Sequence, residues 1–137
     1  MPIVPDTAGA LVLRTDFSDD AAFEAVRAAC ETTSPEGFGA DLTFVSDRAF
    51  AGVTPEQVVA LPKAGYSGFV FLVDDVTITA PEMPVVVVDL LHEPGRWFRV
   101  EPAEMWAVEN NLSLGNMDFF EFADHADPDG VFRAFPD

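Results

Sequence analysis

The chain has 137 residues, a length that suits one domain and is sufficient for a hydrophobic core. Hydrophobic residues make up 49% of the sequence, which excludes a disordered chain, whereas 24 acidic residues against 7 basic ones give a net charge of −17. This charge repels nucleic acid and anionic membrane surfaces, and it would attract a basic protein or a cation. The alternative, which we favour, is that the acidic residues only keep a small apolar domain in solution.

The sequence gives three indications of where the protein works. Cys30 is the single cysteine, so no internal disulfide can form, and it falls on the apolar face of a predicted helix, where a buried thiol is expected rather than a nucleophile. The first residues show no positive segment before an apolar run, so no signal peptide is predicted. The longest aliphatic run, 85–88, is far shorter than a membrane span, and we expect a cytoplasmic protein.

Strands and helices alternate along the first half of the chain. Residues 1–9 contain two prolines and a glycine and are expected to form a loose arm. An apolar strand is predicted at 10–14, and a helix at about 18–31 follows it, with Ser18 as the N-cap. A partly alternating strand at 41–46 comes next.

A short second helix is predicted after Thr54, because Thr54 can cap it, Pro55 suits its first position and Gln57 completes a capping box. Pro62 ends this helix. The apolar run at 68–73 then has the composition of a strand that is buried on both faces.

The next strands form a hairpin. Residues 76–80 either extend the preceding strand or form a crossover turn. A second fully buried strand is predicted at 85–91, and a turn at 92–95 leads to an alternating strand at 96–100. This last strand is half exposed and is predicted at a sheet edge. An exposed edge is compatible with a homodimer formed through it.

Two helices are predicted near the end of the chain, the first at about 103–110 and the second starting near Asn116 or Asp118. The order is therefore β-α-β-α-β-β-β-α-α over a single α/β domain, residues 1–137. Alternating elements imply right-handed crossovers and a parallel sheet with both faces covered. We expect a three-layer sandwich whose mostly parallel sheet has an antiparallel edge hairpin.

Acidic residues follow two of the predicted parallel strands. If these strands are neighbours, the carboxylates meet at the carboxyl edge of the sheet, where open α/β folds place ligands and where Mg²⁺ would find oxygen ligands. The alternative, which we favour, is that these acids cap helices and terminate a strand, with no cofactor bound. The candidate metal ligands are Asp16, Asp19, Asp20, Asp74 and Asp75. A phosphorylatable receiver domain would need a lysine after a late strand, whereas Lys63 lies before the third strand.

No catalytic motif is found in the sequence. Residues 125–130 (HADPDG) imitate the start of a calcium loop, but the twelfth position, which should be glutamate, is Pro136. We therefore interpret this segment as a turn. No nucleophile elbow and no glycine-rich phosphate loop are present, and no catalytic residue is predicted.

The segment 105–123 (MWAVENNLSLGNMDFFEFA) is rich in aromatic and amide side chains. Its apolar residues have the spacing of a helical core, and an αα-corner with a satisfied polar hinge accounts for much of the rest. The functional interpretation is a patch that faces a protein partner, because tryptophan is common among interface hot spots. The candidate patch consists of Trp97, Trp106, Glu109, Asn110, Asn111 and Asn116.

Four segments, 11–26, 68–79, 85–100 and 104–124, resemble a family of small uncharacterised actinobacterial proteins that is catalogued as a domain of unknown function. Among them, RTDFSDD at 14–20 and EMWAVENNLSLGNMDFFEFA at 104–123 stand out. The resemblance implies a bacterial, cytosolic, one-domain protein, and it implies no activity, cofactor or catalytic residue.

Two functions are compatible with the sequence. The first is a non-catalytic interaction domain, comparable to an immunity protein or an inhibitor, that binds a basic protein through its acidic surface. The alternative is a metal-dependent enzyme or phospho-acceptor that uses the aspartates at the carboxyl edge of the sheet. We favour the first, because the chain lacks catalytic motifs and carries a charge of −17.

Overall fold

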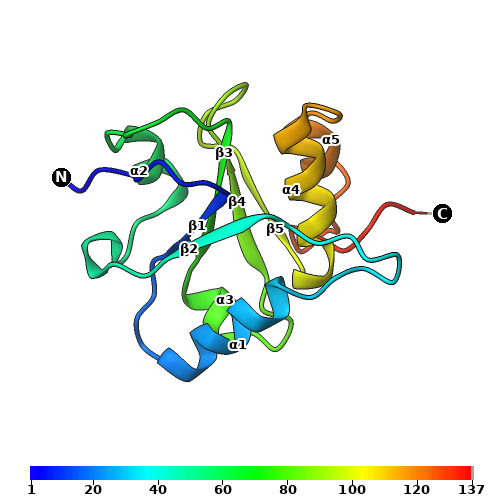
Figure 1. Cartoon of the computed structure of the whole chain (residues 1–137), viewed down its shortest axis with the longest axis horizontal. Helices are drawn as coiled ribbons and strands as arrows, with labels where there is room; N and C mark the ends of the chain where they lie inside the picture. The colour runs from blue at the N-terminus through cyan, green and yellow to red at the C-terminus, as the bar shows by residue number, and fades with distance from the viewer. Residues whose placement is uncertain (137) are drawn as a thin grey trace.

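A six-stranded mixed sheet forms the middle layer of the protein (Figure 1). The computed structural model describes residues 1–136. The strands are β1 (Ala10–Arg14), β2 (Leu42–Val45), β3 (Phe69–Val73), β4 (Val85–Asp89), β5 (Trp97–Val100) and β6 (Val131–Phe132), in the spatial order β2-β1-β3-β4-β5-β6. The predicted α/β fold is confirmed, and the sheet is mostly parallel.

The antiparallel pairs lie in the middle of the sheet. β1 pairs in parallel with β2 and β3, and β5 pairs in parallel with β6, whereas β3–β4 and β4–β5 are antiparallel. The predicted hairpin is therefore present, but its outer strand is not at an edge, because β6 covers β5. A strand of two residues is too short to produce a periodic pattern in the sequence, so it was not predicted as a strand.

Helices cover both faces of the sheet. One face carries α1 (Asp20–Cys30), α3 (Asp75–Thr79), α4 (Met105–Leu114) and α5 (Phe119–Ala123), and the other carries α2 (Pro55–Ala60) with the short 3₁₀ turn Arg48–Phe50. Figure 1 shows α2 on one side of the sheet and α4 with α5 on the opposite side. The predicted three layers follow from this arrangement.

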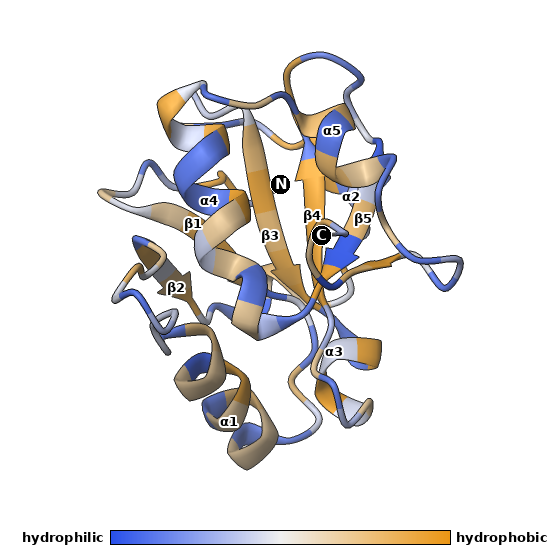
Figure 2. Cartoon of the chain, turned by 90° about the vertical axis from the view of Figure 1, so that its right-hand side faces the viewer, coloured by the Kyte–Doolittle hydropathy of each residue, from blue (hydrophilic) through white to orange (hydrophobic). Residues whose placement is uncertain are grey.

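The two central strands are buried on both faces, as their continuous apolar composition predicts. Phe69, Phe71 and Val73 of β3 contribute to the core beneath α1, α4 and α5, while Val70 and Leu72 contribute to the core beneath α2. Figure 2 shows β3 and β4 as apolar strands, coloured orange, among helices of mixed hydropathy. Strand alternation thus divides one apolar run between two cores.

The capping residues in the sequence predict the start of α2 correctly but not that of α1. Thr54 and Gln57 form the predicted capping box of α2, with Pro55 in its first turn. The prediction that Ser18 caps the first helix is wrong. Asp19 has the extended backbone of an N-cap and accepts a hydrogen bond from Ala22 N–H, whereas Ser18 Oγ donates to Asp16 at 2.5 Å.

Two other segments differ from their predicted structure. The ambiguous residues after β3 form the single helical turn α3, which Asp74 and Thr77 hold in a second capping box, so they do not extend the strand. The arm at residues 1–9 is tied down at Val4, which is buried and exchanges main-chain hydrogen bonds with Pro62 and Ala64. No helix in residues 1–136 is long and apolar enough to cross a membrane.

Helix α4 extends four residues beyond its predicted end and stops at Leu114, where Gly115 adopts a left-handed conformation at φ 73°. The prediction ended the helix at Asn110 because asparagine side chains compete for backbone groups. In the structure Asn110 donates to Gly39 O at 3.1 Å, and Asn111 donates to Ala107 O at 2.8 Å. These bonds satisfy the amides inside the helix.

Candidate functional site

The aspartates predicted as metal ligands do lie at the carboxyl ends of β1 and β3, but four of the five carboxylates already have partners within the protein. Asp19 caps α1, and Asp16 accepts hydrogen bonds from Ser18. Asp20 pairs with Arg14 at 2.7 Å, and the Arg14 side chain is only 6% exposed. Asp75 is exposed in the first turn of α3.

Asp74 makes the strongest of these internal contacts. Its two carboxylate oxygens each accept a hydrogen bond from Arg99 at 2.9 Å, and its Oδ1 also accepts from Thr77. Burial alone would raise the pKa of Asp74, but the hydrogen bonds from Arg99 and Thr77, together with the positive charge of Arg99, hold this pKa below its ordinary value. Asp74 therefore joins β5 to the start of α3.

Two of the five candidate metal ligands bind guanidinium groups of the same chain. Arg14 binds Asp20, and Arg99 binds Asp74. Within residues 1–136, no group of three or more histidine, cysteine, aspartate or glutamate side chains is placed to hold a metal ion. The sequence showed both arginines, but nothing in their local pattern indicated that they face these acids.

The six residues of the predicted partner patch are divided between the two faces of the sheet. Trp97 is 48% exposed and lies opposite Val88 on β4, so its side chain is on the α2 face, where Arg99 lies against its ring. Trp106 belongs to α4 on the other face and stacks on Phe38, with ring centroids 5.5 Å apart. The two tryptophans therefore do not form one patch.

The remaining members of the patch are mainly structural. Asn110 and Asn111 donate hydrogen bonds to the main-chain carbonyls of Gly39 and Ala107, and Glu109 is buried, with 4% of its surface exposed. Asn116 is exposed in the turn after α4. Glu109 was predicted to face a partner at the surface. It instead lines the inner wall of a cavity that was not predicted from the sequence.

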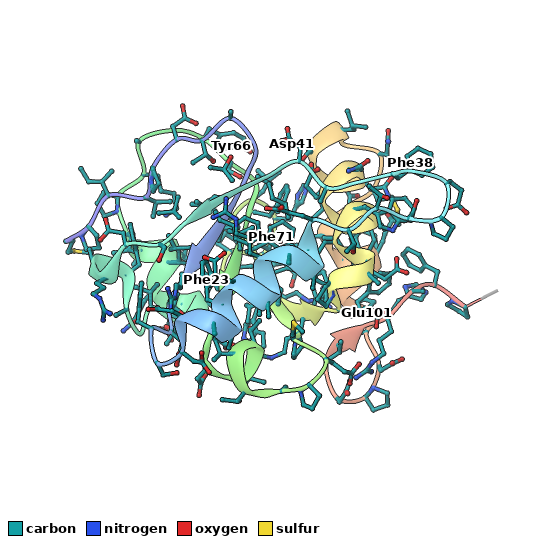
Figure 3. All side chains as sticks on the ribbon, turned by 60° about the horizontal axis from the view of Figure 1, so that its bottom comes forward. Phe23, Phe38, Asp41, Tyr66, Phe71 and Glu101 are labelled. Carbon is teal, nitrogen blue, oxygen red and sulfur yellow. The ribbon has the colours of Figure 1, made fainter. Side chains whose placement is uncertain are left out.

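This cavity has a volume of about 440 Å³ and lies at the edge of the sheet opposite α1 and α3. It opens where β1 and β3 begin and where β4 ends. The side chains that matter for its chemistry are Asp6, Thr7, Asp41, Lys63, Tyr66, Ser67, Glu109 and Ser113. Figure 3 shows Asp41 and Tyr66 at this end of the molecule, away from Glu101. The volume is in the range of about 300–1,000 Å³ that is typical of ligand sites.

Glu109 is the buried acid of the cavity. Its Oε1 accepts hydrogen bonds from Asp41 N–H at 2.5 Å and from Asn110 Nδ2 at 3.1 Å, while its Oε2 accepts from Ser113 Oγ at 2.5 Å. All three donors are neutral, and no lysine, arginine or histidine of residues 1–136 forms an ion pair with this carboxylate. The cavity therefore has an acidic wall without an internal counter-ion.

Lys63 is the one cationic side chain among the cavity residues, and its protons are already used. Nζ donates to the main-chain carbonyls of Val58, Val59 and Leu61 at 2.8–3.0 Å, so it closes the C-terminal end of α2. Burial lowers the pKa of Lys63 from its ordinary value. An ammonium group has only three donors, so this one has none left for a ligand.

A shallower hollow of about 100 Å³ adjoins the cavity. The two share Gly68, Phe69, Leu91 and Leu112 in their walls. Leu91 is 50% exposed and Tyr66 is 78% exposed, so the entrance is bordered by one aliphatic and one aromatic side chain. The site thus combines acidic walls with an apolar rim.

Cys30 does not line the cavity. It is buried on α1, and burial raises the pKa of its thiol to about 12, with a smaller contribution from the charge of Glu31. A thiol that stays protonated is a poor nucleophile. The buried position predicted from the sequence is confirmed.

The acids of the cavity come from three separate parts of the chain: Asp6 from the N-terminal arm, Asp41 from the segment before β2, and Glu109 from α4. Sequence reasoning chose Glu109 for a different reason and missed the other two. The available signal was the spacing of Glu109, Leu112 and Ser113, which places them on one face of a helix.

Comparison with known proteins gives one match. A family model described as a domain of unknown function (DUF6924) matches residues 9–135. No curated protein matches the chain.

Proposed function

The chain belongs to the DUF6924 family of unknown function, and we propose that it is a non-catalytic interaction domain that binds a basic protein in the bacterial cytoplasm, comparable to an immunity protein or an inhibitor. The observation that carries this proposal is the imbalance between its cations and its acids, because all but one of the basic side chains of residues 1–136 are already bound within the protein.

Five of the arginines form ion pairs with carboxylates of the same chain. Arg14 and Arg99 bind Asp20 and Asp74, and Arg27 pairs with Glu31 at 3.3 Å. The other two are Arg96, which pairs with Glu93 and Asp124, and Arg133, which pairs with Glu82, Asp127 and Asp129. Lys63 closes α2. Among the basic side chains of residues 1–136, only Arg48 forms no ion pair and closes no helix end; it is exposed and lies against the ring of Phe17.

Many exposed carboxylates have no such partner among residues 1–136. Examples from different parts of the surface are Asp6, Glu24, Glu36, Asp47 and Glu56. Their field attracts a positively charged protein over a distance of about one Debye length, roughly 8 Å at physiological salt. Such a field mainly accelerates association.

Affinity needs apolar contacts in addition to charge. The exposed aromatic side chains include Tyr66, 78% exposed beside the cavity, and Trp97, 48% exposed on β5. Aromatic side chains are enriched in interface hot spots, whereas charged rims contribute less to affinity. Tyr66 combines both properties because it borders an acidic cavity.

The test is affinity capture from a native lysate of the source organism with the full chain as bait. A captured protein is identified, purified and titrated against the bait at low and high salt. We expect a basic protein that forms a defined complex and an association rate that falls as salt rises. The control bait is an unrelated folded protein of the same net charge.

Two results would contradict the proposal. If every protein bound by the chain binds the charge-matched control equally well, the acidic surface has no specific partner. If the identified partner associates at a rate that does not change with salt, charge does not drive the encounter.

A further inference from the structure

The cavity at the amino end of β1 and β3 has the chemistry of a receptor for a cation. We infer that it receives the guanidinium group of an arginine side chain presented by the basic partner. This inference rests on the proposed function and assigns the part of the surface where the partner is held. The inference depends on the acids of the cavity, on which of its hydrogen-bond donors already have partners, and on the side chains at its rim.

The acids supply the charge. Glu109 is 4% exposed and has three neutral donors as its partners. An ionised carboxylate has about four acceptor positions, so at least one remains for a donor from outside. Asp6 and Asp41 add two exposed carboxylates at the cavity wall, and neither forms an ion pair within residues 1–136. The wall of the cavity therefore carries three acids and no cation that pairs with them.

Apart from the Tyr66 hydroxyl, the side-chain donors of the cavity already have partners. Thr7 Oγ1 donates to Gly9 O at 2.7 Å, Ser67 Oγ donates to Phe69 O at 2.7 Å, and Ser113 Oγ donates to Glu109 at 2.5 Å. Lys63 donates to three carbonyls. The lone pairs of these hydroxyl oxygens stay available, so the wall offers mainly acceptors. A guanidinium group has five N–H donors and no acceptor, which makes it the complementary ligand.

The rim matches the rest of an arginine side chain. Leu91 and Leu112 are shared by the cavity and the adjoining hollow, and they offer an apolar surface for the aliphatic stem. Tyr66 is 78% exposed at the entrance and provides an aromatic face on which a guanidinium can stack. A phosphate or a carboxylate would meet three acids here and no free ammonium group.

Figure 3 shows that the entrance is built from loops, with Asp41 and Tyr66 from different connections at the same end of the molecule. Gly65 permits the close approach of Asp6, because a Cβ atom at Gly65 would lie 2.5 Å from Asp6 Cγ. Gly65→Ala must therefore displace the Asp6 carboxylate, and it serves as a second probe that leaves the charge of the protein unchanged.

The experiment is a titration of the full chain, labelled with ¹⁵N, with N-acetyl-arginine amide, followed by amide chemical shifts. The control ligand is N-acetyl-citrulline amide, which has the same shape and no charge. We expect the arginine derivative to shift the amides of Gly9, Gly65 and Gly68, which belong to the cavity wall. The citrulline derivative should leave them unchanged.

Variants identify the site. Asp6→Asn and Gly65→Ala should each weaken arginine binding about five-fold or more, since a charge-assisted hydrogen bond is lost or misplaced. Glu24→Gln is the matched control, because it also neutralises an exposed acid but lies on α1 outside the cavity. Shifts that are spread over the whole acidic surface, or that Asp6→Asn and Glu24→Gln reduce equally, overturn the inference.

The same variants separate this inference from the proposed function. A captured partner that binds Asp6→Asn and Glu24→Gln equally well overturns the cavity as its contact site and leaves the interaction domain in place. If no protein is captured while the arginine derivative still binds as described, the assignment to a protein partner is overturned. Loss of partner binding in Asp6→Asn alone supports both.

Discussion

Glu109 Oε1 accepts a hydrogen bond from the main-chain N–H of Asp41 at 2.5 Å, across 68 positions of the sequence. This bond fastens α4 to the segment that leads into β2. It also brings the acids of two distant segments to the wall of the same cavity. One buried carboxylate therefore supports the fold and provides charge at the candidate site.

Replacement of Glu109 by alanine should destabilise the protein. Glu109→Ala leaves the donors at Asp41, Asn110 and Ser113 without their acceptor, and we expect a loss of about 2–4 kcal/mol in the free energy of unfolding. Urea denaturation followed by circular dichroism measures it. Glu24→Ala, on the exposed face of α1, should stay within about 0.5 kcal/mol of the parent protein. Equal losses in both variants would show that the network is unimportant.

Replacement of Asp74 by asparagine should cost about 2–4 kcal/mol, because Arg99 loses its carboxylate partner in a part-buried position. The folded-state pKa of Asp74 is lowered, so its contribution is fully present above the ordinary value of 3.8 and is lost as the pH falls through the folded-state pKa.

The difference in unfolding free energy between the parent and Asp74→Asn should therefore be largest near neutral pH and shrink in strong acid. Urea denaturation over a pH series provides this comparison. Asp75→Asn is the control, since Asp75 is exposed in the same helical turn and has no ion pair among the described residues. A difference that grows on acidification would contradict the assigned sign.

Cys30 should be unreactive in the folded protein. Burial raises the pKa of its thiol from 9.0 to about 12, so a disulfide reagent should label it only after denaturation. Because the folded-state pKa is raised, the stability that Cys30 contributes is present below the unfolded value of 9.0 and is lost as the pH rises toward about 12. Cys30→Ala should lack this alkaline loss, and rapid labelling of the native protein would disprove the burial.

Magnesium and manganese should leave the melting temperature unchanged at millimolar concentration. A specific ion would stabilise the folded state by mass action, but Arg14 and Arg99 already bind Asp20 and Asp74. Differential scanning calorimetry with and without metal makes the comparison. A rise in melting temperature that Asp74→Asn abolishes would restore the metal-dependent hypothesis.

Local patterns were sufficient to predict most of the elements. The apolar runs at 68–73 and 85–91 correspond to β3 and β4, and the sequence around Thr54 starts α2 as expected. Boundaries failed where a distant contact changed a local preference. Asn110 and Asn111 remain inside α4 because one of them binds Gly39, which no window around the helix contains.

The candidate site was less predictable than the fold. The predicted patch around Trp106 was extended to Trp97 on the neighbouring edge strand, but the structure places the two tryptophans on opposite faces of the sheet. Asp41 was predicted as the first residue of a strand and Asp6 as part of a loose arm, and neither was proposed as a site residue. Their relation to Glu109 follows from the packing of α4 against the segment before β2.

Composition and short-range periodicity were enough to predict the α/β class, the two-sided burial of the central strands and the buried cysteine, and they give the charge of −17. Which acids are neutralised and which line a cavity depends on the tertiary structure. The pairing of Asp74 with Arg99 and the contact of Glu109 with Asp41 join residues that are far apart in the chain. Strand order and helix docking bring such residues together, and no local pattern encodes them.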